Sequence, residues 1–145
     1  MIGYVFDDGG REEAGYKGSA SDCVARAIAI LTDTPYKQVY KHIADFNFNH
    51  GQSRSARNGV KVKDTPKLMT EFGLEKVKLG RGTRPTYTEA YNTYGNCIVK
   101  TTKHVCALVD GNLCDTFDGR SYWWDDGLTI TERERKATSI WVMKE

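Results

Sequence analysis

The spacing of apolar residues predicts an amphipathic helix over residues 21–31. Its apolar positions recur at intervals of three, four and one residues, so they fall on one helical face. Those positions are Cys23, Ala27, Ile30 and Leu31. Ser21 precedes them and can cap the amides of the first turn. The predicted helix therefore buries a face that carries a cysteine close to its N-terminus.

Three further helices are predicted, over about residues 35–46, 66–72 and 87–94. The first two begin with proline, whose fixed φ suits the first helical position. The third follows Thr86, which has the spacing of a capping box with Glu89. The expected caps are Thr34, then Asp64 or Thr65, then Thr86, with Gly73 and Gly95 after the last two helices.

From residue 96 onward the pattern is typical of β-structure. Short apolar runs over 97–100, 103–118, 122–124 and 140–143 predict an antiparallel sheet. Residues 75–79 alternate as a strand does, and Tyr4-Val5-Phe6 suits an edge strand. The fold class is therefore α+β, with helices first and an antiparallel sheet after them.

The position of Cys23 suggests either a nucleophile or a structural residue. A thiol at a helix N-terminus meets roughly half a positive charge from the aligned peptide dipoles, which favours the thiolate. Free cysteine is also among the most buried residue types, so a structural role is the alternative.

The hairpin around Asp110-Gly111 favours the nucleophile. Two short apolar runs around this turn dipeptide predict a two-residue loop. The resulting register pairs Val109 with Asn112 and puts His104 and Asp115 on one face, as diagonal neighbours. Phe117 shares that face and Asp118 points to the other. The hairpin would thus supply an imidazole and a carboxylate able to fix its tautomer.

Length and composition agree with one folded domain over residues 1–145. The chain is 39% hydrophobic and 28% charged, and it has no apolar run near the roughly 20 residues of a membrane span. The N-terminus lacks a basic start and an apolar segment, so we expect a cytoplasmic protein whose four cysteines stay reduced. The cysteine spacing does not suit zinc, and we expect no metal and no cofactor. Cys97, Cys106 and Cys114 are expected to fill the core.

Charge is uneven along the chain despite a net value of only +2. Residues 54–84 contain nine lysines and arginines against three acids, a local net charge of +6. Such a stretch can bind a phosphate backbone or an acidic protein, although it is more often a solvated surface. A binding protein that contacts nucleic acid or a host protein is therefore the alternative to an enzyme.

The order of Cys23, His104 and Asp115 resembles that of the papain-like cysteine peptidases. Asp115-Thr116-Phe117 is similar to their Asn-Ser-Trp motif, in which the aromatic ring shields the bond to the histidine. The Ser21-Asp22-Cys23 helix and the sequence KHVCALVDGNLCDTFD also look like those of short phage and bacterial proteins. The resemblance implies a papain-like fold, and a cytoplasmic location in a bacterial host if the chain is phage-encoded.

The resemblance also implies a cysteine hydrolase acting on a peptide or protein substrate. The bond cleaved would be a peptide, isopeptide or other amide bond; transglutaminase-like acyl transfer would use the same residues. Cys23 would attack the carbonyl, His104 would carry the proton, Asp115 would orient His104, and Phe117 would be the shielding aromatic residue. Papain-like enzymes place an oxyanion-stabilising glutamine where this chain has Lys17. Lys17, Ser19 and Ser21 are the candidate substitutes.

Overall fold

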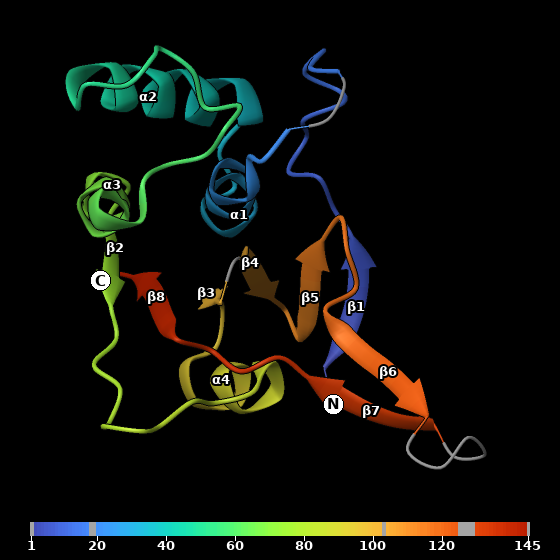
Figure 1. The fold of residues 1–145 in the computed structure, drawn as a ribbon. Helices are drawn as coiled ribbons and strands as arrows, with labels where there is room; N and C mark the ends of the chain where they lie inside the picture. Colours follow the sequence, from blue (N-terminus) through green and yellow to red (C-terminus); the bar gives the residue numbers. More distant parts are fainter. Residues whose placement is uncertain (1, 18–19, 103, 125–129, 145) are drawn as a thin grey trace.

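The computed structural model describes residues 2–17, 20–102, 104–124 and 130–144, with the backbone alone for 121–124 and 130–133. These residues form an α+β fold with four α-helices, one 3₁₀ helix and eight strands (Figure 1). The helices are α1 (Cys23–Thr32), α2 (Tyr36–Asn49), η1 (Val62–Asp64), α3 (Thr65–Glu71) and α4 (Tyr87–Tyr94). The strands are β1 (Gly3–Phe6), β2 (Leu74–Lys76), β3 (Cys97–Thr101), β4 (His104–Val109), β5 (Asn112–Asp115), β6 (Arg120–Trp124), β7 (Ile130–Glu134) and β8 (Ser139–Met143).

Six strands form the main sheet, in the order β1-β5-β4-β3-β8-β2. The expectation of a fully antiparallel sheet is wrong at one edge, because β1 pairs in parallel with β5. The strand expected at 122–124 exists as part of β6, but it lies outside the main sheet. It pairs with β7 in a two-stranded antiparallel ribbon. The sheet is therefore mostly antiparallel, and the N-terminal segment lies beside the β4–β5 hairpin.

The sheet has a different covering on each face (Figure 1). Helices α1, α2 and α3 lie on one side and α4 lies on the other. Alternation along β3 separates the two cores: Ile98 packs with Ile28 and Trp141 under α1, whereas Cys97 and Val99 pack with α4. Both layers are thus built on the same central strands, and α1 packs directly against β4.

The predicted helices are present, with corrections at their ends. Asp22, not Ser21, is the N-cap of α1, and its side chain makes no capping hydrogen bond. Helix α2 begins at Tyr36 because Pro35, at ψ 134°, is still extended, so Pro35 takes the cap position expected for Thr34. Helix α3 ends at Glu71, with Phe72 rather than Gly73 as its C-cap.

The capping box of α4 is confirmed, because Thr86 and Glu89 bond each other's backbone amides. Among the described residues, no helix has both the length and the apolarity that crossing a bilayer requires.

Candidate functional site

Cys23 is the first residue of α1 and is partly exposed. The Asp22 carboxylate does not cap the helix, so no side chain at the N-cap occupies the first-turn amides. Because α1 packs on β4, the Cys23 sulfur meets the start of that strand. There it lies close enough to the His104 imidazole and the Val105 amide for both groups to lower the pKa of the Cys23 thiol. The helix end and the strand end together hold the thiol at the boundary of the two layers.

His104 is the first residue of β4 and links the thiol to a carboxylate. Its Nε2 lies 2.5 Å from Oδ2 of Asp115. Since Nε2 is occupied by this bond, Nδ1 is the ring nitrogen left for the Cys23 sulfur. The His104 side chain is 21% exposed, which leaves one edge of the site open to solvent.

Asp115 is the last residue of β5 and is buried. Its Oδ1 accepts a hydrogen bond from the Thr116 amide at 2.8 Å. Its backbone carbonyl accepts two more, from the Tyr4 hydroxyl and the Asp7 amide, both at 3.0 Å. Hydrogen bonds from strand β1 and the segment after it therefore fix the backbone of Asp115 at the position where its side chain binds His104.

The predicted hairpin register is confirmed. Val109 pairs with Asn112 and Ala107 pairs with Cys114. Asp110 and Gly111 both have positive φ, at 52° and 82°, as a two-residue hairpin turn requires. His104 and Asp115 consequently meet as the register predicts.

Asp118 has a different partner, because its carboxylate binds the Arg120 guanidinium through two contacts of 2.9 Å. The Arg120 side chain is the first cause of the lowered pKa of Asp118. This pairing leaves Asp115 as the acid of the site.

The site shifts the protonation of its two central groups in opposite directions. Burial raises the pKa of Cys23, but the hydrogen bonds from His104 and the Val105 amide, with the charges of His104 and Arg26, lower it overall. The hydrogen bond to Asp115 and then that to Cys23 raise the pKa of His104 to about 9, against the effect of burial. The arrangement therefore favours a thiolate beside an imidazolium.

The three other cysteines have the opposite environment. Burial raises the pKa of the Cys97 thiol to about 12 and raises those of Cys106 and Cys114 as well. All three are buried in the sheet. Cys23 is thus set apart from the other thiols of the chain by both position and charge.

The candidate oxyanion donors differ in where they lie. Lys17 is exposed and lines a cavity of about 430 Å³ together with Asp22, Arg26 and Thr116. Ser21 is exposed too, but its amide donates to the Arg57 carbonyl at 2.8 Å. Ser19 lies outside the described residues. The cavity beside α1 therefore brings Lys17, of the three, next to residues that flank Cys23.

Phe117 follows the end of β5 and is 53% exposed. The guanidinium carbon of Arg135 lies 5.1 Å from the centre of its ring. Its proposed role as a shield over the His104–Asp115 bond stays a prediction.

A buried ionic network next to Cys23 was not anticipated from the sequence. The Asp22 side chain is fully buried and binds Arg26, the Tyr36 hydroxyl and, at 3.1 Å, Nε of Arg11. Arg26 also places its Nη2 4.0 Å from Oδ1 of Asp115. The only sequence signal was the i, i+4 spacing of Asp22 and Arg26, because Arg11 and Tyr36 come from other elements.

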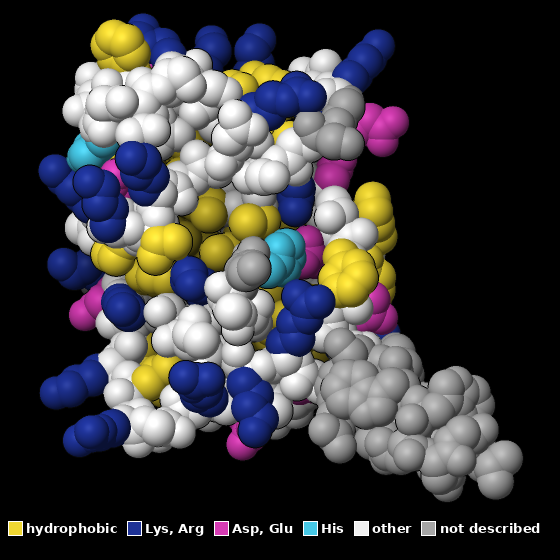
Figure 2. Space-filling view, in the orientation of Figure 1, with side chains coloured by type: hydrophobic (Ala, Val, Ile, Leu, Met, Phe, Trp, Pro, Cys, Tyr) yellow, Lys and Arg dark blue, Asp and Glu magenta, His cyan; other side chains and the backbone are white. Residues whose placement is uncertain are grey.

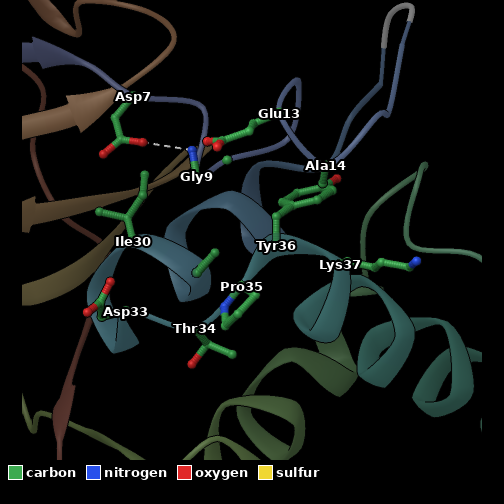
Figure 3. Close-up of a pocket in the computed structure, with 12 residues that line it drawn as sticks. Asp7, Gly9, Glu13, Ala14, Ile30, Asp33, Thr34, Pro35, Tyr36 and Lys37 are labelled. Carbon is green, nitrogen blue, oxygen red and sulfur yellow. Dashed lines mark hydrogen bonds between the residues drawn. The ribbon is translucent and has the colours of Figure 1, made fainter.

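Another cavity, of about 450 Å³, lies at the opposite end of α1 (Figure 3). Asp7, Gly9, Asp33 and Tyr36 are among its lining residues, and Asp7 accepts a hydrogen bond from the Gly9 amide. None of Cys23, His104 and Asp115 lines it. Among the described residues, no group of three or more histidines, cysteines and acids is arranged to hold a metal ion.

Figure 2 shows that basic side chains gather over the left and lower parts of one face of the molecule, with few acidic ones among them. Apolar side chains line a depression near the middle of this face, where α1 meets the sheet. No protein-family model, no curated protein and no solved structure matches the chain.

Proposed function

We propose that the chain is a cysteine hydrolase of the papain-like class that cleaves peptide, isopeptide or other amide bonds. The observation that carries the proposal is the chain of contacts from Cys23 through His104 to Asp115. These residues come from α1, β4 and β5, so three elements position one nucleophile, one base and one orienting acid. The α+β order, in which the cysteine helix precedes every strand of the main sheet except β1, supports the papain-like assignment.

The proposed reaction has two steps. The Cys23 thiolate attacks the amide carbon, and a tetrahedral oxyanion forms. His104 then gives its proton to the leaving nitrogen as the C–N bond breaks, which leaves an acyl thioester on Cys23. Water attacks the thioester carbon and gives a proton to His104. The C–S bond then breaks, the carboxylic acid product leaves, and the Cys23 thiolate and the His104 imidazolium are restored.

The oxyanion would form at the N-terminus of α1. The Cys23 amide is the first-turn donor nearest the nucleophile. Lys17 is the candidate for the second donor, because it lines the cavity beside Asp22 and Arg26. Loss of one such donor typically costs about 10²–10³ in rate, so Lys17→Ala should reduce turnover by that order.

A peptide mixture of defined composition tests the function directly. Mass spectrometry should detect new termini with the native protein and none with Cys23→Ala or His104→Ala. Asp118→Ala is the matched control and should retain cleavage, because Asp118 binds Arg120. Cleavage that persists in Cys23→Ala would show that the thiol is not the nucleophile.

Limited alkylation with iodoacetamide near pH 6 tests the activated thiol separately. Cys23 should be carboxamidomethylated before the other three cysteines, whose burial disfavours their thiolates. Equal modification of all four under native conditions would contradict the proposal. A reactive Cys23 without any amide cleavage would favour the binding-protein alternative.

A further inference from the structure

A third cavity, of about 420 Å³, has a composition unlike the others. Its lining residues are Arg84, Thr101, Thr102, Arg135, Lys136 and Thr138. Three of these are cationic, three carry hydroxyl groups, and none is acidic. The Thr138 hydroxyl already donates to the Lys100 carbonyl at 3.1 Å. The cations with the Thr101 and Thr102 hydroxyls are the groups that can donate hydrogen bonds to an anion while attracting its charge.

Backbone pairing holds the three basic residues in place. The Ala137 amide donates to the Pro85 carbonyl at 2.7 Å, and the Thr138 amide donates to the Lys100 carbonyl at 2.8 Å. A β-bridge joins Thr86 to Lys136. In Figure 1 the segment from β7 to β8 runs past α4 toward the sheet, in agreement with these bonds. The cavity is therefore built where three separate parts of the chain are tied together.

The acids closest in sequence to these cations are engaged elsewhere. The Glu89 carboxylate caps the Thr86 amide, and the Glu134 carboxylate accepts bonds from the amide and hydroxyl of Thr88. Among the described residues, no ion pair involves Arg84, Arg135 or Lys136. Lys136 lies near enough to Glu89 to help the Thr86 amide lower the pKa of that carboxyl, but no acid lines the cavity itself, so its lining stays positively charged.

Two residues that line the cavity, Thr101 and Arg135, connect it to the candidate active site. Thr101 is paired with His104 across the turn between β3 and β4. Arg135 lies over the ring of Phe117, two residues after Asp115. A group bound in the cavity would therefore lie beside the strand end that carries His104.

We propose that this cavity is an anion subsite that binds a substrate carboxylate, so that the enzyme selects peptides with Asp or Glu near the bond that it cleaves. This inference rests on the proposed amide hydrolase. A nucleic-acid strand would need cations spaced along its phosphates and open rings for stacking. Here three basic residues line a single cavity, and the Phe117 ring at its border already carries Arg135.

Nuclear magnetic resonance of the full chain with Cys23→Ala tests the subsite without turnover. The probes are two capped pentapeptides, Ala-Ala-Glu-Ala-Ala and Ala-Ala-Gln-Ala-Ala. The glutamate peptide should shift the amides of Thr101, Thr102 and Lys136, and the glutamine peptide should bind about tenfold more weakly. The double variant Arg84→Gln/Lys136→Gln should remove that difference.

Lys63→Gln/Lys67→Gln is the matched control, because it removes the same charge from exposed positions that do not line the cavity. Equal binding of the two peptides, or an equal loss in this control, would overturn the inference. A single-stranded oligonucleotide that shifts these amides when the glutamate peptide does not would overturn it in favour of nucleic acid. Because this experiment measures binding without cleavage, its result is independent of the cleavage test. Absence of selective binding would contradict the subsite alone, and absence of cleavage would contradict the hydrolase alone.

Discussion

Arg26 lies between the carboxylates of Asp22 and Asp115, and its positive charge acts on both and on the Cys23 thiol. It binds Asp22 within α1 and approaches Asp115 at 4.0 Å. Its charge also helps to lower the pKa of Cys23, although less than the hydrogen bond from His104 does. The Arg26 guanidinium thus connects Asp22, the buried residue at the N-terminus of α1, with Asp115, the carboxylate that binds His104.

The contrast between Asp115 and Asp118 gives a prediction for two residues three positions apart. Asp115→Ala removes the first cause of the raised pKa of His104, so the thiolate loses part of its partner's charge. The pH at which Cys23 begins to react with iodoacetamide should therefore rise. Asp118→Ala should leave that profile nearly unchanged, since Asp118 binds Arg120. The reverse order of effects would exclude Asp115 as the orienting acid.

His104 itself should titrate near pH 9, well above the ordinary value for histidine. Because its folded pKa is raised, the stability that it adds is fully present below about pH 6.5 and is lost as the pH rises through about 9. Proton resonances of the imidazole should follow this curve in the native protein. In Asp115→Asn the midpoint should fall. A His104 midpoint near 6.5 in the native protein would contradict the ion pair.

The stability of helix α1 depends on contacts of Asp22 with residues that lie outside the helix. The carboxylate is fully buried and faces Arg11, Arg26 and Tyr36. Asp22→Asn takes the fully buried charge from between Arg11 and Arg26, and breaking a buried ion pair typically costs about 3–5 kcal/mol. Urea denaturation should show this loss in the free energy of unfolding.

Asp45 provides the comparison, because it pairs with Arg54 at the surface with 64% of its side chain exposed. Asp45→Asn should cost less than about 1 kcal/mol. Similar losses for the two substitutions would mean that the Asp22 network adds little stability.

The elements that the sequence predicted are those whose signals are local. The apolar spacing of α1, the capping box of α4 and the alternation around Asp110-Gly111 all lie within about 15 residues, and all three elements form. The predicted buried face of α1 is only partly right, because Cys23 and Ile30 are partly exposed whereas Val24 and Ile28 are buried. The hairpin register was sufficient to separate Asp115 from Asp118. Local pattern therefore predicted the three central residues of the candidate site.

The features that were missed depend on distant partners. Nothing near Tyr4-Val5-Phe6 specifies that this strand will run parallel to residues 112–115. The capping pattern favoured Ser21, but Asp22 is the cap residue, and its carboxylate binds Arg11 and Tyr36 instead of the first-turn amides. The basic cavity likewise combines residues from three separate segments. Such contacts arise from packing and leave no periodic trace in the sequence.

At the scale of the whole molecule, both ends of the chain belong to one sheet. Strand β1 pairs with β5, and β8 lies between β3 and β2. We therefore expect one cooperative unfolding transition, with the same urea midpoint by far-ultraviolet circular dichroism and by tryptophan fluorescence. Two separate midpoints would show that residues 1–145 do not form one domain.

The bonds from Tyr4 and Asp7 to the Asp115 carbonyl have a consequence for synthesis of the protein. Cys23 and its helix leave the ribosome long before Asp115 is made, whereas β1 must wait for β5 before it can pair. A nascent chain that ends before residue 115 contains Cys23 but lacks Asp115, the carboxylate that raises the pKa of His104. We therefore expect the proposed activation of the Cys23 thiol only after residue 115 has been translated, and fragments that end before it should carry an ordinary cysteine.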